Sequence, residues 1–188
     1  NKDYRGKRKS MYLSKISIKN FRMFSDAVEI SFSKGLNLLV GENGSGKSSV
    51  VDAIRALLGE NEFSRRGIIE EDFYSVFCES QKKSSESFFI SGVFSNLTEA
   101  QKVEYLSWLD KDFNAKLNFE VQQTLNRRNN YKQKRWGGSS SNSFFDVEPL
   151  NDIQCVYLPA LRDAERSLRT GRGSRLARFI ANLSADDL

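Results

Sequence analysis

The feature that most constrains the fold is a glycine-rich segment in the first third of the chain. Residues 41–48 read Gly-Glu-Asn-Gly-Ser-Gly-Lys-Ser and satisfy the pattern G-x-x-x-x-G-K-[ST]. This pattern forms a phosphate-binding loop that follows a strand and opens a helix. The neighbouring sequence fits, because residues 36–40 are a short apolar run typical of a buried strand. Residues 47–58 carry apolar side chains at helical spacing, and Gly59 predicts the helix end.

Each residue type in this loop has a chemical role. Gly41, Gly44 and Gly46 allow positive φ and close approach, so successive main-chain N–H groups can surround a β-phosphate at the positive end of the helix dipole. Lys47 is the predicted catalytic residue, with its ammonium between the β- and γ-phosphates, and the Ser48 hydroxyl is the predicted Mg²⁺ ligand. The residues expected to bind ATP in this loop are Asn43, Gly44, Ser45, Gly46, Lys47, Ser48 and Ser49.

The rest of the chain alternates between strand and helix patterns, which predicts an α/β fold. Residues 14–32 show period-two alternation that predicts two paired strands. Thr98 and Gln101 form a capping box for a helix reaching Leu109, with Val103 and Leu106 on its inner stripe. The other predicted elements are strands at 87–94, around 117–121 and at 153–158, a flexible loop at 137–143, and helices at 160–168 and 174–183.

Composition excludes several classes of function. The 188 residues contain no histidine, which removes Ser-His-Asp triads, imidazole bases and histidine-containing zinc sites. Cys78 and Cys155 show no CxxC spacing, and no apolar run is long enough to span a bilayer, so a cytoplasmic location is expected. The net charge of +5 favours phosphate-bearing partners. Residues 1–10 are expected to form a disordered basic arm, with residues 11–188 as one domain.

Two sets of residues resemble known families. Residues 15–22 (Lys-Ile-Ser-Ile-Lys-Asn-Phe-Arg), followed by Gly-Glu-Asn-Gly-Ser-Gly-Lys-Ser-Ser, resemble the N-terminal lobe of the SMC/RecF branch of ABC-type ATPases. Within that branch, residues 157–165 (Tyr-Leu-Pro-Ala-Leu-Arg-Asp-Ala-Glu) and 171–176 (Gly-Arg-Gly-Ser-Arg-Leu) resemble the OLD family of ATP-dependent endonucleases, as does Glu-Asp-Phe-Tyr at 71–74. The resemblance implies an ATPase head whose N-terminal lobe has a mixed sheet, and it implies that Arg22 lies near bound nucleotide.

The resemblance also implies partners and a longer protein. Two copies of such a head sandwich ATP and Mg²⁺, and a Toprim-type nuclease domain with carboxylates and a divalent metal follows the ATPase. This sequence has neither an apolar run ending in Asp-Glu nor a Leu-Ser-Gly-Gly segment, so the catalytic acid for hydrolysis is expected beyond it. The function implied is the ATPase module of an OLD-like DNA endonuclease in defence against phage. It would contact DNA and form a homodimer or higher oligomer, away from membranes.

Two alternatives to that function stay open. One is a RecF- or SMC-like DNA repair ATPase that has no nuclease of its own. The other is a non-hydrolysing, ATP-bound scaffold or sensor that assembles with a separate effector or nuclease subunit.

Three charged groups have both functional and ordinary interpretations. Arginines at 162, 166 and 169 share a helical face that could contact DNA, a partner subunit or only solvent. The basic segment 127–135, which surrounds Tyr131 and precedes Trp136, could follow a nucleic-acid backbone or be a solvated loop. The adjacent acids Glu70, Glu71 and Asp72 are expected to be a solvated surface, because three consecutive carboxylates do not converge on one metal ion.

Overall fold

The computed structural model describes residues 11–78, 81–126, 130–142, 145 and 147–158. The chain divides into two compact units, residues 1–153 and residues 154–188. The predicted basic arm, the predicted helices at 160–168 and 174–183, the arginine row and the segment 171–176 lie outside the described residues. In the second unit only residues 154–158 are described, and none of these is in a helix or strand.

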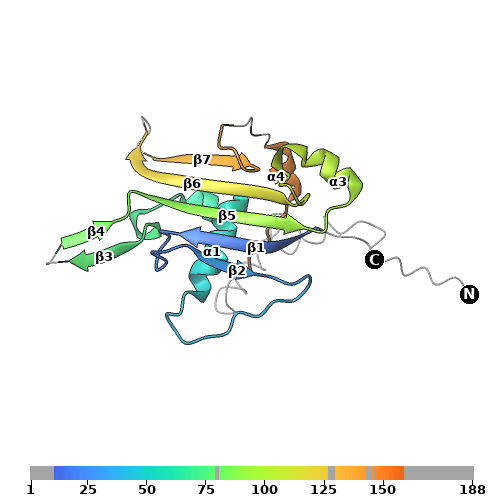
Figure 1. Cartoon of the computed structure of the whole chain (residues 1–188). Helices are drawn as coiled ribbons and strands as arrows, with labels where there is room; N and C mark the ends of the chain where they lie inside the picture. The colour runs from blue at the N-terminus through green and yellow to red at the C-terminus, as the bar shows by residue number, and fades with distance from the viewer. Residues whose placement is uncertain (1–10, 79–80, 127–129, 143–144, 146, 159–188) are drawn as a thin grey trace, which may run out of the picture. The chain divides into compact units, whose positions relative to one another are not determined.

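An antiparallel sheet of five strands organises the first unit (Figure 1). Its order is β2 (Val28–Ser31), β1 (Tyr12–Lys19), β5 (Ser87–Ser95), β6 (Ala115–Leu125) and β7 (Tyr131–Gly137). The predicted strands at 14–32, 87–94 and 117–121 are therefore confirmed. Alternation along the strands sends Ile16, Ile90 and Phe119 to one buried face, because successive side chains in a strand point to opposite sides.

The helix α1 (Lys47–Leu58) covers that buried face, behind the sheet in Figure 1. Its buried side is Val50, Ala53, Ala56 and Leu57, and Gly59 ends it in the left-handed conformation, as the sequence predicts. Small alanines let the helix lie close to the strands, and burial of the apolar stripe fixes which way α1 faces. The predicted α/β class and the helix after the glycine-rich loop are both confirmed.

Shorter elements connect these parts. They are α2 (Asn61–Arg66), η1 (Glu70–Asp72), the hairpin β3 (Ser75–Cys78) and β4 (Gln81–Ser84), α3 (Glu99–Glu104), η2 (Leu106–Trp108) and α4 (Glu148–Asp152). None of the helices within the described ranges has both the length and the apolar composition needed to cross a membrane.

The capping box of α3 is confirmed, but the prediction that Val103 and Leu106 lie on the buried side of the helix is wrong. Thr98 accepts a hydrogen bond from the Gln101 N–H, and the Gln101 side chain accepts one from the Thr98 N–H. The helix ends at Glu104 and continues as the 3₁₀ turn η2, so Val103 and Leu106 are exposed. Tyr105 and Trp108 are buried in their place, because a 3₁₀ turn has three residues per turn rather than 3.6 and so moves the buried face.

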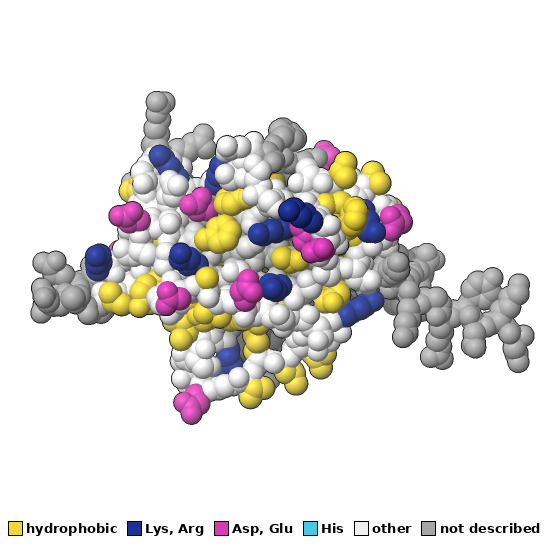
Figure 2. Space-filling model, in the orientation of Figure 1, with side chains coloured by type: hydrophobic (Ala, Val, Ile, Leu, Met, Phe, Trp, Pro, Cys, Tyr) yellow, Lys and Arg dark blue, Asp and Glu magenta, His cyan; other side chains and the backbone are white. Residues whose placement is uncertain are grey.

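Residues 36–40 are in neither a helix nor a strand, which contradicts the prediction of a buried strand. The exposed fraction is 86 % for Leu36 and 90 % for Val40. A strand buried on both faces needs neighbouring strands, and no described strand pairs with this segment. Figure 2 shows hydrophobic side chains along the lower edge, over the loop that Figure 1 draws below the sheet. All described strand pairs are antiparallel, which contradicts the predicted mixed sheet for the described part of the chain, because no strand forms at 36–40 to pair with the others.

The predicted strand at 153–158 is wrong for the same reason. Its residues are in neither helix nor strand within the described part of the chain, and Val156 and Leu158 are exposed. An apolar run predicts a strand only where another strand supplies its hydrogen bonds.

Gly137 provides a test of how β7 packs against η2. A Cβ placed on Gly137 would lie 2.1 Å from Cδ1 of the buried Trp108 ring. Gly137→Ala should therefore lower the free energy of unfolding by about 1–3 kcal/mol, because the rigid indole must move. Chemical denaturation measures the change, and Gln133→Ala at an exposed position of the same strand serves as the control. Equal stability of the two variants would contradict this packing.

Candidate functional site

The glycine-rich loop lies on the surface at the start of α1. Residues 41–45 are exposed, and the chain enters the helix at Gly46, which is buried. Gly44 and Gly46 have φ values of 84° and 90°, a region that side chains with a Cβ disfavour. The predicted residues therefore lie on both sides of the helix start: Asn43 to Ser45 are in the exposed loop, Gly46 is the N-cap, and Lys47 to Ser49 form the first turn of α1.

Close packing is a second reason why position 46 needs a glycine. A Cβ at this position would lie 2.5 Å from Sδ of Met23 and 3.0 Å from the Phe24 ring. Those two residues belong to the turn that follows β1, where Phe21 and Phe24 form a β-bridge. The turn at 21–24 therefore packs directly on the end of the glycine-rich loop, a contact that the sequence pattern does not reveal.

The Lys47 ammonium bridges the two ends of the loop. Its Nζ donates hydrogen bonds to the carbonyl oxygens of Gly41 and Glu42, at 2.7 and 2.6 Å. The third contact is a longer one of 3.4 Å to Oγ of Ser45. An ammonium has three donors, so two are fixed by the backbone and the third can turn to an anion in the loop.

The first turn of α1 suits an anion. The N–H groups of Lys47, Ser48 and Ser49 begin the helix and have no partner within it. Gly46 supplies no side-chain cap, and the first turn contains no acidic residue. These N–H groups and the positive end of the helix dipole favour a bound phosphate.

The Ser48 hydroxyl fits the role of a magnesium ligand. The residue is exposed in the first helical turn, beside the N–H groups that suit the phosphates. No cluster of three or more potential metal-ligating side chains occurs within the described ranges. A magnesium ion here would therefore take its other ligands from phosphate oxygens and water, as Mg²⁺ commonly does.

Arg22 lies in the turn at 21–24 and has a positive φ of 51°. Its Nη1 forms an ion pair with Asp52 of α1, and its Nε donates to Asp72 at 3.2 Å. The Arg22 N–H also donates to the main-chain oxygen of Asp72. Arg22 is therefore tied to the helix that follows the glycine-rich loop, while its Nη2 bonds to no residue in the described part of the chain.

Asp72 is fully buried, which contradicts the prediction that residues 70–72 are a solvated surface. Its Oδ2 accepts hydrogen bonds from Arg66 at 2.7 Å and from the N–H of Ile69 at 3.1 Å. The 3₁₀ turn η1 turns Asp72 inward while Glu70 and Glu71 stay exposed. A buried carboxylate requires such partners, because its desolvation is costly.

The charge network continues along α1. Asp52 also accepts a hydrogen bond from Arg55 at 2.7 Å, and Arg55 reaches Glu60 at 3.0 Å. Burial lowers the pKa of Arg55, but the hydrogen bonds to Glu60 and Asp52 outweigh it and raise the pKa above its ordinary value. Asp52 is a site residue that the motifs did not indicate, although its i,i+3 spacing from Arg55 is a recognisable sign of pairing.

Arg135 holds the other end of α1. The segment containing it is strand β7 rather than a loop, and Arg127 and Arg128 lie outside the described residues. The Arg135 side chain points to the helix side, donates to the Ala56 carbonyl at 2.8 Å and lies 3.9 Å from the Phe119 ring centroid. Burial lowers the pKa of Arg135 to about 10, so it stays charged at neutral pH beside the negative end of the helix dipole.

Comparisons with known proteins agree with this geometry. The AAA ATPase domain family matches residues 11–150. The chain is 58% identical over 50 residues to the chromosome partition protein Smc of Chlorobaculum tepidum, and this match covers 27% of the chain. It is 45% identical over 56 residues to the DNA double-strand break repair Rad50 ATPase of Thermoplasma volcanium, which covers 30% of the chain.

Among solved structures, the Smc head domain of Pyrococcus furiosus, with an extended coiled coil and bound to the C-terminal domain of ScpA, matches with a TM-score of 0.50. The identity is 22%, and the match covers 76% of this chain and 32% of that one, so the likeness concerns the fold. The matched segments span only 4% and 6% of the lengths of the Smc and Rad50 relatives.

Asp72 gives a direct test of the charge network. Asp72→Ala leaves Arg22 and Arg66 without their shared carboxylate, so we expect the free energy of unfolding to fall by about 2–4 kcal/mol. Glu71→Ala, one residue earlier and exposed, should change it by less than about 0.5 kcal/mol. Denaturant unfolding of both variants measures the difference. Similar small losses in the two would show that the Asp72 carboxylate does not stabilise the fold.

Proposed function

Because the chain belongs to the AAA ATPase domain family, we propose that it is the ATP-binding head of a larger ATPase that acts on DNA. The observation that carries the proposal is the loop at 41–49, which leads into the uncapped N-terminus of α1 and holds the Lys47 ammonium against the Gly41 and Glu42 carbonyl oxygens. The Smc and Rad50 relatives, whose names concern chromosome partition and DNA double-strand break repair, support DNA as the partner.

In this proposal the chain's own residues bind and orient the nucleotide. The N–H groups from Asn43 to Ser49 hold the phosphates, the third Lys47 donor contacts the β- and γ-phosphates, and Ser48 ligates Mg²⁺. Bound Mg²⁺ would neutralise phosphate charge. Arg22 presents its remaining Nη2 to the nucleotide, held in place by Asp52 and Asp72.

Nucleotide-dependent pairing of two heads is the second part of the proposal. Residues that complete hydrolysis would come from a second copy or from another part of a longer protein, because this sequence has no Leu-Ser-Gly-Gly segment and no apolar strand ending in Asp-Glu. Light scattering with and without Mg²⁺ and a non-hydrolysable ATP analogue tests the pairing in the 188-residue chain. A homodimer that forms only with the analogue is the expected result.

The second candidate function is the ATPase module of an OLD-like DNA endonuclease that defends against phage. Residues 157–165, 171–176 and 71–74 favour it, since they resemble that family. Sequencing any continuation of the gene product past Leu188 tests it. A Toprim-type acid cluster would favour the endonuclease, heptads with a zinc hook or hinge would favour a RecF- or SMC-like repair ATPase, and neither would favour a scaffold or sensor with a separate nuclease subunit.

Lys47→Ala tests the nucleotide site itself. Loss of the ammonium removes a charge-assisted contact to the phosphates and the bridge to Gly41 and Glu42, so the Kd for ATP should rise by about 100-fold. Calorimetric titration with Mg-ATP measures the change, and Lys111→Ala, on an exposed turn, should bind like the wild type. Unchanged affinity in Lys47→Ala would refute the proposed role of this side chain.

Ser48→Ala separates the metal from the phosphates. The variant loses one oxygen ligand for Mg²⁺, so its affinity for ATP in the presence of Mg²⁺ should fall by about tenfold. In excess EDTA the variant and the wild type should bind ATP equally, because the main-chain N–H groups are unchanged. An equal loss of affinity with and without Mg²⁺ would assign Ser48 to the phosphates instead.

A further inference from the structure

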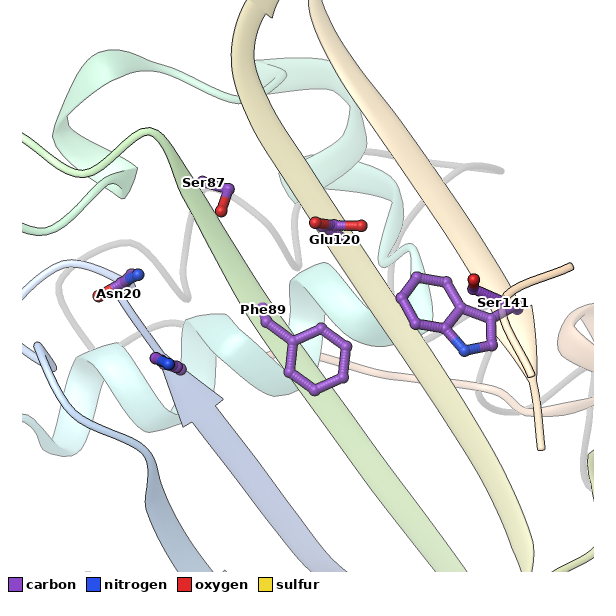
Figure 3. A pocket seen from close by; sticks show the side chains of 7 residues that line it. Asn20, Ser87, Phe89, Glu120 and Ser141 are labelled. Carbon is purple, nitrogen blue, oxygen red and sulfur yellow. The ribbon is translucent and has the colours of Figure 1, made fainter. Parts of the chain in front are cut away.

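A second concave site lies on the opposite face of the sheet from α1 (Figure 3). It has a volume of about 420 Å³, within the usual range for pockets that hold a small ligand or one nucleotide. Phe89 and Glu120 point into it from β5 and β6, and Ser141 lies at its edge in the loop after β7. Lys19, at the end of β1, and Trp136 of β7 also line the site.

Strand register brings its charged residues into one row. Lys19 pairs with Phe89, Phe89 with Glu120, and Glu120 with Lys134, so four adjacent strands contribute side chains at the same level. The two lysines are separated by three strand spacings, or about 14 Å. This row therefore has a positive charge at each end, with an aromatic ring and a carboxylate between them.

The aromatic wall of the pocket is held in place. The Phe89 and Trp136 ring centroids lie 5.8 Å apart with a tilt of 33°, and Lys134 Nζ is 5.7 Å from the Trp136 ring centroid. Trp136 has an exposed fraction of 9 %, while Phe89 is half-buried and so keeps part of its ring open to solvent. Asn118 fixes the strand end by donating to the carbonyl oxygens of Trp136 and Gly138.

The same face carries an excess of basic side chains. By register it includes Lys15, Lys19, Lys116, Lys132 and Lys134, against Glu29 and Glu120. Lys15 is paired with Glu29 at 3.2 Å. Figure 2 shows lysine and arginine side chains spread over this side of the molecule, among acidic and apolar ones. An anionic polymer is therefore a better match for this face than an acidic or neutral protein surface.

We propose that this pocket binds an unpaired base of single-stranded DNA. The base stacks on Phe89, its N–H groups donate to Glu120, and the flanking phosphates contact Lys19 and Lys134. A base within a duplex cannot enter, because its faces are covered by its neighbours. The inference deepens the proposed function, since it rests on DNA as the partner and names the form of DNA and the site.

Two measurements on the 188-residue chain test the site. Anisotropy of a labelled oligothymidylate of about twelve nucleotides reports affinity, and a blunt duplex of similar length serves as the comparison. Tryptophan emission reports the pocket, because Trp108 is fully buried in the core while Trp136 lines the site. We expect the single strand to bind at least about tenfold more tightly than the duplex and to quench the emission of Trp136.

Phe89→Leu removes the ring but keeps an apolar side chain of similar size. We expect it to raise the Kd for the single strand by about 5- to 100-fold, with the melting temperature showing whether the fold is retained. Equal binding of single strand and duplex by the wild type, or an unchanged Kd in a folded Phe89→Leu protein, would overturn the proposal.

Charge changes give an independent test. Lys134→Glu and Lys19→Glu should each weaken binding and reduce the slope of log Kd against log salt by about 0.7, the value for one phosphate contact on single-stranded DNA. Lys116→Glu is the matched control, because Lys116 lies on the same face but pairs with Val93, four residues along β5 from the row that contains Lys19, Phe89, Glu120 and Lys134. Equal effects of all three substitutions would indicate only general attraction and would contradict a defined site.

Nucleotide binding separates this inference from the proposed function. Phe89→Leu and Lys134→Glu should bind Mg-ATP like the wild type, because both residues lie on the face away from α1. If Lys47→Ala loses ATP binding, the nucleotide site is supported. If Phe89→Leu binds single-stranded DNA like the wild type in the same experiments, the base pocket alone is contradicted.

Discussion

The packing of α1 against the antiparallel sheet is the constraint on which the candidate nucleotide site depends. Val50, Ala53 and Leu57 bury the helix against strands β1, β5 and β6. The helix start then presents uncapped N–H groups beside the glycine-rich loop, and its end is held by Arg135. Since the helix cannot rotate without exposing its apolar stripe, the loop and Lys47 are fixed relative to the sheet.

Ion pairs also position the turn at 21–24 and the buried Asp72 relative to α1. The turn at 21–24 packs on Gly46, and Arg22 of that turn joins Asp52 on α1 to the buried Asp72. These ion pairs are partly shielded from solvent, so their directions are well defined and the loss of one partner leaves a costly unpaired charge. Strand β7 contributes to both faces of the sheet. The Arg135 side chain lies on the α1 face, and the neighbouring Lys134 and Trp136 side chains lie on the opposite face.

Sequence patterns predicted the local elements well, but they failed for strand pairing and burial, which depend on groups far away in the sequence. Residues 47–58 form the predicted helix because spacing and Gly59 are local signals. The apolar run at 36–40 predicted a strand, yet a strand exists only if a neighbour supplies hydrogen bonds, and no described strand does. Asp72 looked solvated beside Glu70 and Glu71, but the partners that bury it, Arg22 and Arg66, come from other segments.

The sequence by itself determined the glycine-rich loop, the helix that follows it and the alternating strands, because these depend on neighbours a few residues apart. The tertiary structure alone decided that Met23 and Phe24 cover Gly46, that Asp72 is buried, and that Lys19, Phe89, Glu120 and Lys134 share one row. The physical reason is that register and burial are set by contacts between segments far apart in the chain, which no local pattern encodes.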